Sequence, residues 1–286
     1  MGLTDKNRIE QLKNIAVQVR RDSLRMVHGV QSGHPGGSLG CADFMVGLFF
    51  EVMNIQPENF TLSGKNEDVF FMSNGHITPV LYSTMARRGY FPISELATFR
   101  KLGTRLQGHP SVLHGLPGIR AASGSLGQGV SIALGVCEAK KMNGDKNLVY
   151  VLTGDGELQE GQIWEALMYA GAKQVDNLIL TVDYNHLQID GTVEQVMSLG
   201  NLADKFRSFL WEVIEGEGND MEQLLNNLHQ AKQAVGKGKP VAFLMHTRMG
   251  SGVDFMENKN KFHGTPLDDE QLKNALSQLK ETIGDY

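Results

Sequence analysis

The sequence predicts an α/β protein in which a doubly wound, mostly parallel sheet is flanked by helices. Short apolar runs rich in β-branched residues alternate along the chain with longer stretches of helical periodicity. Strands that are separated by helices pair in parallel through right-handed crossovers. The 286 residues, 41% of them hydrophobic and 21% charged, are also sufficient for a sizeable buried core.

The expected elements follow one another from the N-terminus. Residues up to about 65 are predicted to be mainly helical, with an amphipathic helix from near Ile9 and a more buried helix in "CADFMVGLFFEVMNI". The expected strands are 68–73, 147–153, 177–183, 211–216 and 241–247, and further helices are expected at 77–87, 127–141, from about 158, 202–209 and 221–235. A helical tail is expected over about 267–286, opened by Asp268 or Asp269. With no internal repeat or low-complexity linker, residues 1–286 are expected to form a single domain.

Composition and charge narrow the range of functions. The 27 Lys and Arg residues against 32 Asp and Glu residues give a net charge of −5, and no basic stripe is present, so no nucleic-acid partner is expected. The charged N-terminus has no apolar signal core and no apolar run reaches about 18 residues, so no membrane association is expected. Cys41 and Cys137 lie far apart in apolar segments, which favours core thiols in a reducing compartment. We therefore expect a cytoplasmic protein that acts on small molecules.

A carboxylate follows one of the expected strands in "GDGELQEGQ", residues 154–162. In an open α/β sheet, ligands bind at the carboxyl ends of the strands, where the following helices present free backbone N–H groups. Asp155 is at such an end, and its neighbours Gly154 and Gly156 allow the backbone to approach a ligand closely. The long, Gly- and Pro-punctuated segment 103–129 is expected to be a functional loop near this edge.

The next strand ends close to Asn185, which supplies a second oxygen donor at the same edge of the sheet. Carboxylate and carboxamide oxygens that leave sites open for water and phosphate suit Mg²⁺. The pair therefore predicts a metal site that binds a diphosphate. An EF-hand is excluded because Leu187 stands where a third acidic or amide ligand is needed. A nicotinamide site is excluded because "GSLGQG", 124–129, reverses the glycine order of the dinucleotide fingerprint.

Four histidines stand in loop-like, glycine-rich contexts that offer no evident core-packing role: His34, His76, His109 and His263. An imidazole titrates near neutrality and can both donate and accept, which suits a reaction that moves hydroxyl protons. Three other histidines, His28, His186 and His229, are expected to be structural. A zinc site at His109 and His114 lacks a third ligand at a suitable spacing.

Six segments together resemble the transketolase family in order and spacing. They are "SGHPGGSLG", "SNGH", "QGHP", "SGSLGQG", "GDGELQEGQIWEA" with "NLILTVDYNHLQIDG", and "FHGTPL". The resemblance runs from about Arg20 to Leu267 and implies the thiamine diphosphate-binding fold, in particular its diphosphate-binding (PP) domain. It covers only the amino-terminal half of a transketolase.

The resemblance also implies roles for individual residues. Asp155 and Asn185 through their side chains, and Leu187 through its main-chain carbonyl, would bind Mg²⁺ or Ca²⁺. The residues implied in cofactor binding are His76, Gly124, Ser125, Leu126, Gly156, Glu160, Asn185 and His263; the family often has proline where Ser125 stands. His34, His109 and His263 match catalytic histidines of the substrate channel, and Glu160 and Glu165 match acidic residues at the interface between cofactor sites.

The implied activity is transfer of a two-carbon ketol unit from a ketose to an aldose, both expected to be phosphates. The family's activating glutamate and phosphate-gripping arginines belong to parts that this sequence does not contain. We therefore expect an N-terminal subunit of a split transketolase that needs a C-terminal partner subunit, in a heterotetramer of two copies of each. The alternatives are a subunit of a deoxyxylulose-phosphate synthase-like enzyme or of a 2-oxoacid dehydrogenase first component, or a non-catalytic regulatory half.

Overall fold

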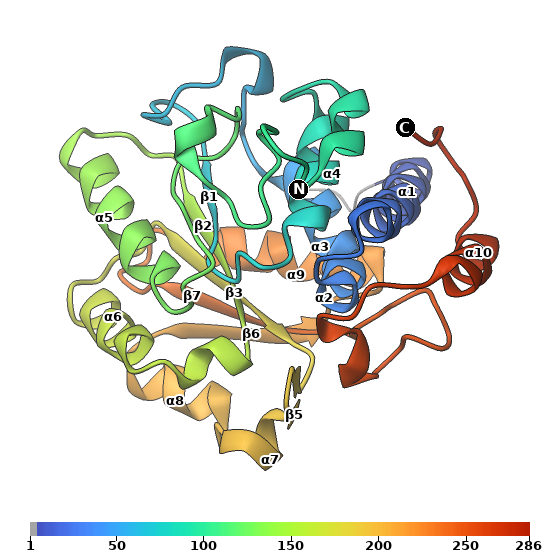
Figure 1. Cartoon of the computed structure of the whole chain (residues 1–286). Coiled ribbons are helices and arrows are strands. Elements are labelled where there is room, and N and C mark those ends of the chain that lie inside the picture. The colour runs from blue at the N-terminus through green and yellow to red at the C-terminus, as the bar shows by residue number, and fades with distance from the viewer. Residues whose placement is uncertain (1–4) are drawn as a thin grey trace.

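A five-stranded parallel sheet forms the centre of the computed structural model, which describes residues 5–286 (Figure 1). Its strands are β1 (Val69–Met72), β2 (Val149–Gly154), β3 (Leu178–Tyr184), β6 (Glu212–Glu217) and β7 (Val241–His246), in the spatial order β1-β2-β3-β7-β6. These strands coincide closely with the five predicted from the sequence. The predicted class, a mostly parallel sheet flanked by helices, is confirmed.

Helices cover both faces of this sheet because its central strands carry apolar side chains on both sides. Phe70 and Met72 of β1 join a core with α1 (Lys6–Val30), α3 (Ala42–Gly47), α4 (Thr78–Arg88) and α9 (Met221–Ala234). The alternate residues Val69 and Phe71 join a second core with α5 (Gly129–Met142), α6 (Gly161–Ala172) and α8 (Leu202–Ser208). Strands buried on both faces are typical of parallel sheets.

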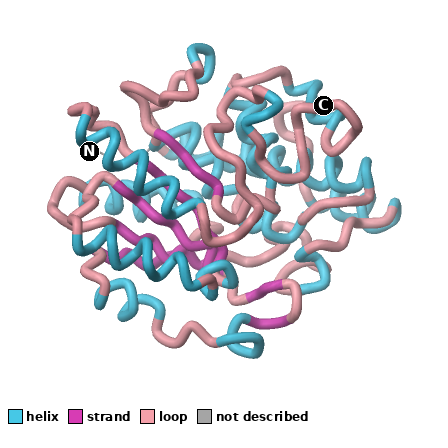
Figure 2. The backbone as a smooth tube through the Cα atoms, turned by 60° about the vertical axis from the view of Figure 1, so that its left-hand side comes forward, coloured by secondary structure: helices cyan, strands magenta, loops and turns pink. Residues whose placement is uncertain are grey.

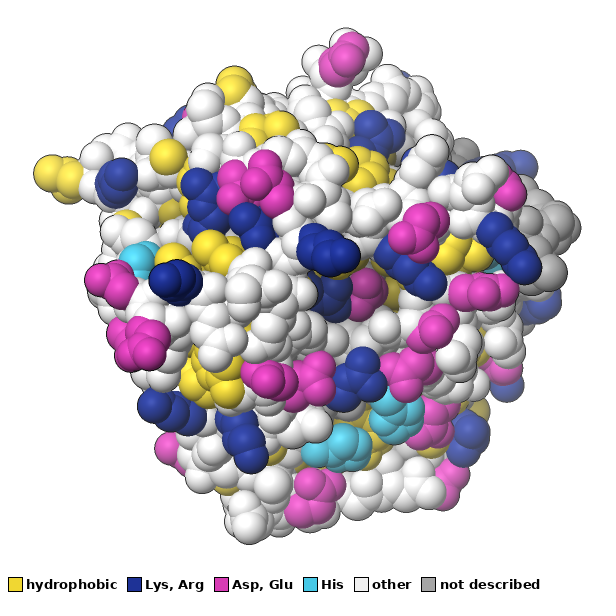
Figure 3. All heavy atoms as spheres, turned by 90° about the vertical axis from the view of Figure 1, so that its right-hand side faces the viewer, with side chains coloured by type: hydrophobic (Ala, Val, Ile, Leu, Met, Phe, Trp, Pro, Cys, Tyr) yellow, Lys and Arg dark blue, Asp and Glu magenta, His cyan; other side chains and the backbone are white. Residues whose placement is uncertain are grey.

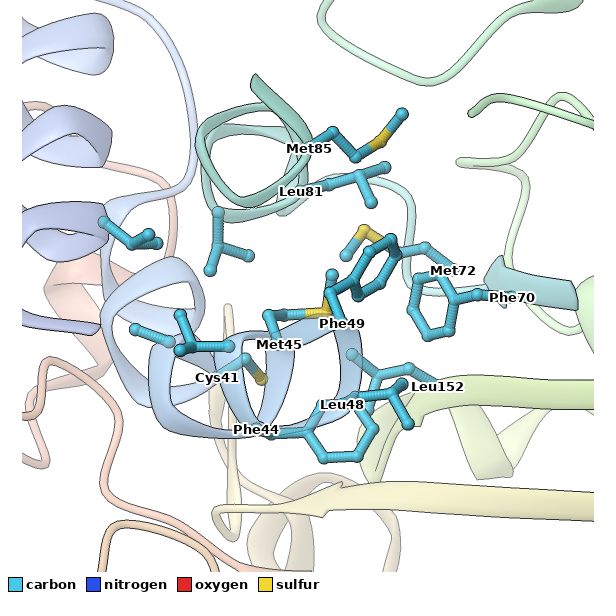
Figure 4. Close-up of a cluster of buried hydrophobic side chains, with 14 of the residues drawn as sticks. Cys41, Phe44, Met45, Leu48, Phe49, Phe70, Met72, Leu81, Met85 and Leu152 are labelled. Carbon is cyan, nitrogen blue, oxygen red and sulfur yellow. The ribbon is translucent and has the colours of Figure 1, made fainter. Parts of the chain in front are cut away.

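The N-terminal segment consists of the long helix α1 followed by shorter helical pieces. The helix predicted within residues 41–55 consists of α3 and a π-helical turn, Leu48–Val52, and it is preceded by α2 (Pro35–Gly40). Figure 4 shows side chains of this region, among them Cys41, Phe44, Met45, Leu48 and Phe49, packed towards Phe70, Met72 and Leu152 of the sheet. Cys41 and Cys137 are both buried and free, which confirms the prediction of core thiols.

Several short elements at the carboxyl edge of the sheet were not predicted from the sequence. The antiparallel pair β4 (Leu187–Gln188) and β5 (Gly191–Thr192) leads into α7 (Val193–Met197), and in Figure 2 this pair lies apart from the main sheet. The helix expected from about 158 begins at Gly161, because a 3₁₀ turn, Gly156–Gln159, comes first. Other 3₁₀ turns are Pro57–Asn59, Ile93–Thr98, Val112–His114 and Asn260–His263.

The C-terminal segment packs beside α1. Its helix α10 (Asp269–Gln278) is capped by Asp268, as predicted. On the face that carries α1 and α10, positive and negative side chains are interspersed (Figure 3). No helix within residues 5–286 is long and apolar enough to cross a membrane.

One ion pair between α1 and α4 is almost completely buried. Asp22 accepts hydrogen bonds from Arg87 Nε at 2.5 Å and Nη2 at 2.9 Å, and from Ser83 Oγ at 2.7 Å. The exposed side-chain fractions are 0% for Asp22 and 3% for Arg87. Removal of one partner from such a pair leaves an uncompensated buried charge.

We predict that Arg87→Met lowers the free energy of unfolding by about 3–5 kcal/mol, because the Asp22 carboxylate loses its counter-charge. Urea denaturation measures the loss. The control is Arg207→Met on α8, whose pair with Asp204 is largely exposed and is worth at most about 1 kcal/mol. Equal losses in the two variants would contradict the prediction.

Candidate active site

A cavity of about 590 Å³ opens at the carboxyl ends of β1, β2 and β3. Segments that are distant in the sequence meet there: the start of α2, the loop after β1, the glycine-rich loop, the turn after β2, the end of β3 and the 3₁₀ turn Asn260–His263. The polar residues that line it are His34, Asn74, His76, His109, Asp155, Glu157, Gln159, Glu160, Asp183, Asn185, Gln188 and His263. This is the edge at which open α/β sheets bind ligands.

Asp155 lies directly after β2, as the sequence predicts, and its side chain is buried in the cavity wall. The residue is 1% exposed, and its carboxylate accepts backbone N–H bonds from Gly156 at 2.7 Å and His186 at 2.5 Å. Burial and, next, the charge of Asp183 raise the pKa of this carboxyl to about 8. The ionised form therefore lacks a counter-charge, which a bound cation would supply.

Asn185 follows β3 and lies beside Asp155, because Gly154 and Asp183 are in register in neighbouring strands. The amide Nδ2 of Asn185 donates to Asp183 Oδ2 at 2.9 Å, and its Oδ1 accepts from the backbone N–H of Leu187 at 2.9 Å. Asp183 thus sets the orientation of the carboxamide and leaves its oxygen on the opposite side from Asp183.

Asp183 was not singled out in the sequence, although a carboxylate near the end of the apolar run "NLILTV" was a usable signal. It is 3% exposed and accepts a hydrogen bond from Thr247 Oγ1, and burial raises its pKa. Two buried carboxyl groups therefore share this end of the cavity.

The donor atoms here fit a hard divalent cation. Carboxylate, carboxamide and backbone carbonyl oxygens are ligands that Mg²⁺ and Ca²⁺ prefer, and Mg²⁺ usually keeps positions for water or substrate phosphate. Residues 5–286 contain no group of three or more His, Cys, Asp or Glu side chains placed to hold a metal ion. Nearby, Asn74 Oδ1 is buried and has no hydrogen-bond partner in the described chain, so it is free for a polar ligand.

Three histidines from distant parts of the chain form a cluster that lines the same cavity. The ring centroids of His34 and His76 are 4.9 Å apart, those of His76 and His263 are 5.2 Å apart and stacked, and those of His34 and His263 are 5.6 Å apart. His34 precedes α2, His76 follows β1, and His263 ends the last 3₁₀ turn. His34 Nδ1 is buried without a hydrogen-bond partner among residues 5–286.

Burial keeps these imidazoles in the neutral form. It lowers the pKa of His34 to about 4, with help from His263, Arg100 and His109, and it lowers the pKa of His76 well below the ordinary value. The pKa of His263 is also lowered by burial. A neutral imidazole presents one ring nitrogen as a hydrogen-bond donor and the other as an acceptor.

His109 is more exposed than the other three, and it lies against Gly124 of the same glycine-rich segment, 103–129. A Cβ atom on Gly124, whose φ is +118°, would come within 2.5 Å of His109 Cδ2. Only glycine permits this approach and this backbone conformation. Burial and then the charge of Arg100 lower the pKa of His109.

The loop is also held by a residue that the sequence analysis missed, Glu157. Its carboxylate accepts hydrogen bonds from Ser73 Oγ, from the Gly127 N–H at 2.8 Å and from the Gly154 N–H at 3.1 Å. It is 3% exposed, and burial raises its pKa. Glu157 thereby joins the loop after β1, the glycine-rich loop and the turn after β2.

The structure brings together most of the predicted site residues, and two lie elsewhere. Gly124, Leu126, Gly156, Glu160 and Leu187 line the cavity with the residues already described. Ser125 is exposed and accepts a hydrogen bond from Gln128, outside the cavity lining. Glu165 is exposed on α6 and borders a shallow groove between α5 and α6.

Comparison with known proteins assigns this chain to a family. Residues 11–284 match a family described as "Transketolase, thiamine diphosphate binding domain". The chain is 38% identical to a 6-deoxy-6-sulfo-D-fructose transketolase subunit of Clostridium sp. (strain MSTE9), over 94% of this chain and 96% of that subunit. It is 34% identical to an apulose-4-phosphate transketolase subunit of Phocaeicola vulgatus, over 96% of each chain.

Solved structures agree with the sequence comparison. Transketolase from Leishmania mexicana superposes with a TM-score of 0.87 at 30% identity, over 96% of this chain and 42% of that one. The chain therefore belongs to the transketolase family. It matches the amino-terminal, thiamine diphosphate-binding part of the full-length enzymes and nearly the whole of the two subunits.

We predict that Glu157→Ala weakens thiamine diphosphate binding by about 10- to 100-fold, because the loops around the site lose the group that joins them. The free energy of unfolding should fall by about 1–3 kcal/mol, since two backbone N–H groups lose their acceptor. Calorimetric titration and urea denaturation measure the two effects. Glu222→Ala, an exposed change on α9, is the control. Unchanged cofactor affinity in Glu157→Ala would contradict the prediction.

Proposed function

We propose that this chain is the N-terminal subunit of a split transketolase that transfers a two-carbon ketol unit from a ketose to an aldose. The observation that carries the proposal is the cleft, where buried carboxyl groups and neutral histidines face one cavity at the carboxyl edge of the sheet. The chain matches two transketolase subunits over nearly their whole length, which supports a separate partner chain.

Thiamine diphosphate and a divalent cation, Mg²⁺ or Ca²⁺, are the proposed cofactors. Asp155, Asn185 and the carbonyl of Leu187 would hold the cation. The diphosphate would be held by the cation, His76, His263 and the backbone near Gly156, and the ring system would be lined by Gly124, Leu126 and Glu160. When bound, thiamine diphosphate supplies the electron-sink chemistry that breaks the carbon–carbon bond beside a ketose carbonyl.

The histidines of the cleft are proposed to act on the sugar. His34, His109 and His263 would orient substrate hydroxyl groups, since a neutral imidazole both donates and accepts hydrogen bonds, and would move protons during the reaction. Exposed His109 stands nearest to solvent, and the more buried His34 and His263 stand deeper in the cleft.

The substrates are proposed to be anionic sugars. One similar subunit is named for a sulfonated ketose, 6-deoxy-6-sulfo-D-fructose, and the other for a phosphorylated one, apulose 4-phosphate. Among residues 5–286, the side chains that line the cavity include no Lys or Arg. The anion would therefore be bound by the partner subunit, which would also supply the activating glutamate.

A C-terminal transketolase subunit is the proposed partner, in a heterotetramer of two copies of each chain. Glu160 at the start of α6 and the exposed Glu165 on the same helix would lie at the contact between cofactor sites. Carboxylates at such a contact need hydrogen bonds across it to offset the cost of burial.

We predict that Asp155→Ala abolishes cation-dependent thiamine diphosphate binding, because the alanine leaves no anionic ligand at that position. Calorimetry with the partner chain present measures the affinity with Mg²⁺ and with a chelator. Asp204→Ala, an exposed carboxylate on α8, should bind as the wild type does. Wild-type, Mg²⁺-dependent affinity in Asp155→Ala would show that the metal assignment is wrong.

The partner requirement gives a direct test of the proposed function. The purified chain alone should show no ketol transfer from xylulose 5-phosphate or 6-deoxy-6-sulfo-D-fructose to an aldose phosphate. Addition of the C-terminal subunit should restore transfer, measured as formation of the new ketose. Full activity of the chain alone would refute the split-enzyme proposal, and no transfer by the assembled, cofactor-loaded complex would refute the reaction.

A further inference from the structure

The guanidinium of Arg100 contacts two of the loops that carry the histidines of the cleft. Arg100 Nη1 donates to Ser32 Oγ at 3.0 Å, and Nη2 approaches the carbonyl oxygen of Gly108 at 3.4 Å. Ser32 is two residues before His34, and Gly108 directly precedes His109. One side chain therefore bridges the two histidine loops.

The surrounding chain is built closely around this side chain. A Cβ atom on Gly108 would lie 2.6 Å from Arg100 Cζ, so only glycine leaves room for the guanidinium. Phe99, the preceding residue, packs against Gly33, where a Cβ atom would lie 3.6 Å from Phe99 Cε1. Phe99 and Arg100 together thus support the backbone that precedes His34.

Arg100 also has an unfavourable backbone conformation. Its φ is 55°, in the left-handed region, and its N–H donates to the carbonyl of Leu106 at 2.9 Å. A residue with a Cβ atom adopts this conformation at a free-energy cost, and such positions persist where the surrounding structure requires them. The bond to Leu106 closes the loop so that the side chain points back to Gly108.

The charge of Arg100 is not neutralised by a carboxylate. It forms no ion pair within residues 5–286, and its Nε is buried without a hydrogen-bond partner there. Burial lowers its pKa, and the one titratable group that opposes this is Tyr82. Arg100 is half-buried, and because no carboxylate pairs with it among the described residues, its positive charge is left to act on the neighbouring imidazoles.

We propose that Arg100 is a positioning residue that holds the His34 and His109 loops in place and sets a positive charge against both imidazoles. The inference rests on the proposed function of these histidines in the reaction. Arg100 does not line the cavity, so it would act through the two histidines rather than on the sugar itself.

The charge of Arg100 lowers the pKa values of the neighbouring histidines. Burial, then the charge of His263 and then that of Arg100 and of His109 lower the pKa of His34; burial and then the charge of Arg100 lower the pKa of His109. His76 is the remaining titratable neighbour of His34, with its ring centroid 4.9 Å from that of His34. A nearby cation disfavours the protonated imidazole, so loss of the Arg100 charge should raise both pKa values.

The test compares Arg100→Met, which removes the charge, with Arg100→Lys, which retains it. Histidine titrations by NMR on the full-length chain, labelled at the imidazole carbons, should show that Arg100→Met raises the pKa of His109 and His34 by on the order of 1 pH unit. Arg100→Lys should restore the lower pKa values. Arg105→Met, which removes a charge from the same loop at an arginine paired with Glu95, should leave both pKa values unchanged.

Unchanged histidine pKa values in Arg100→Met would overturn the inference, and so would an equal rise in Arg105→Met. In the complex with the partner chain, the acid limb of the kcat/KM profile should move to higher pH in Arg100→Met and return in Arg100→Lys. If the pKa values rise while the acid limb stays, the placement of Arg100 is supported and the proposed role of His34 and His109 in turnover fails.

Discussion

Parallel pairing of β2 with β3 is the interaction on which the whole cleft depends. Its register sets Gly154 opposite Asp183, so that Asp155, directly after Gly154, and Asn185, two residues after Asp183, emerge at the same edge. A shift of register by one residue would move each side chain to the opposite face of the sheet. The buried apolar side chains on both faces of these strands prevent such a shift, so core packing and ligand geometry are specified by the same contacts.

Two groups of residues that line the cleft differ in their electrostatic character. Asp155 and Asp183 are buried carboxyl groups whose pKa values are raised, whereas His34, His76 and His263 are imidazoles that burial keeps neutral. Under the proposed function, the carboxyl end of the cleft takes the cation, and the histidines contact both the diphosphate and the sugar hydroxyl groups. Arg100 lies outside the cavity lining, and its charge favours the neutral form of His34 and His109.

The features of the fold and the site that could be predicted from the sequence are those that depend on residues close together in the sequence. Asp155 and Asn185 could be placed from the sequence because strand ends are local features and neighbouring strands share an edge. Glu157 could not, because "GELQEG" resembles the start of an exposed helix and its burial depends on Ser73 and Gly127. The β4–β5 pair and α7 were missed because each is too short for a periodic pattern. The neutral state of the histidines depends on burial, which no sequence motif reports.

The histidine cluster has a consequence for the order in which the molecule can assemble. His34, His76 and His263 come from segments separated by as much as most of the chain. Contacts between residues so far apart in sequence carry a large loop-closure cost and form slowly. During synthesis the ribosome delivers His263 only after all the strands of the sheet have been made, so the sheet can pair before the cluster closes. The histidine cluster therefore cannot close until a segment made after every strand of the sheet has left the ribosome.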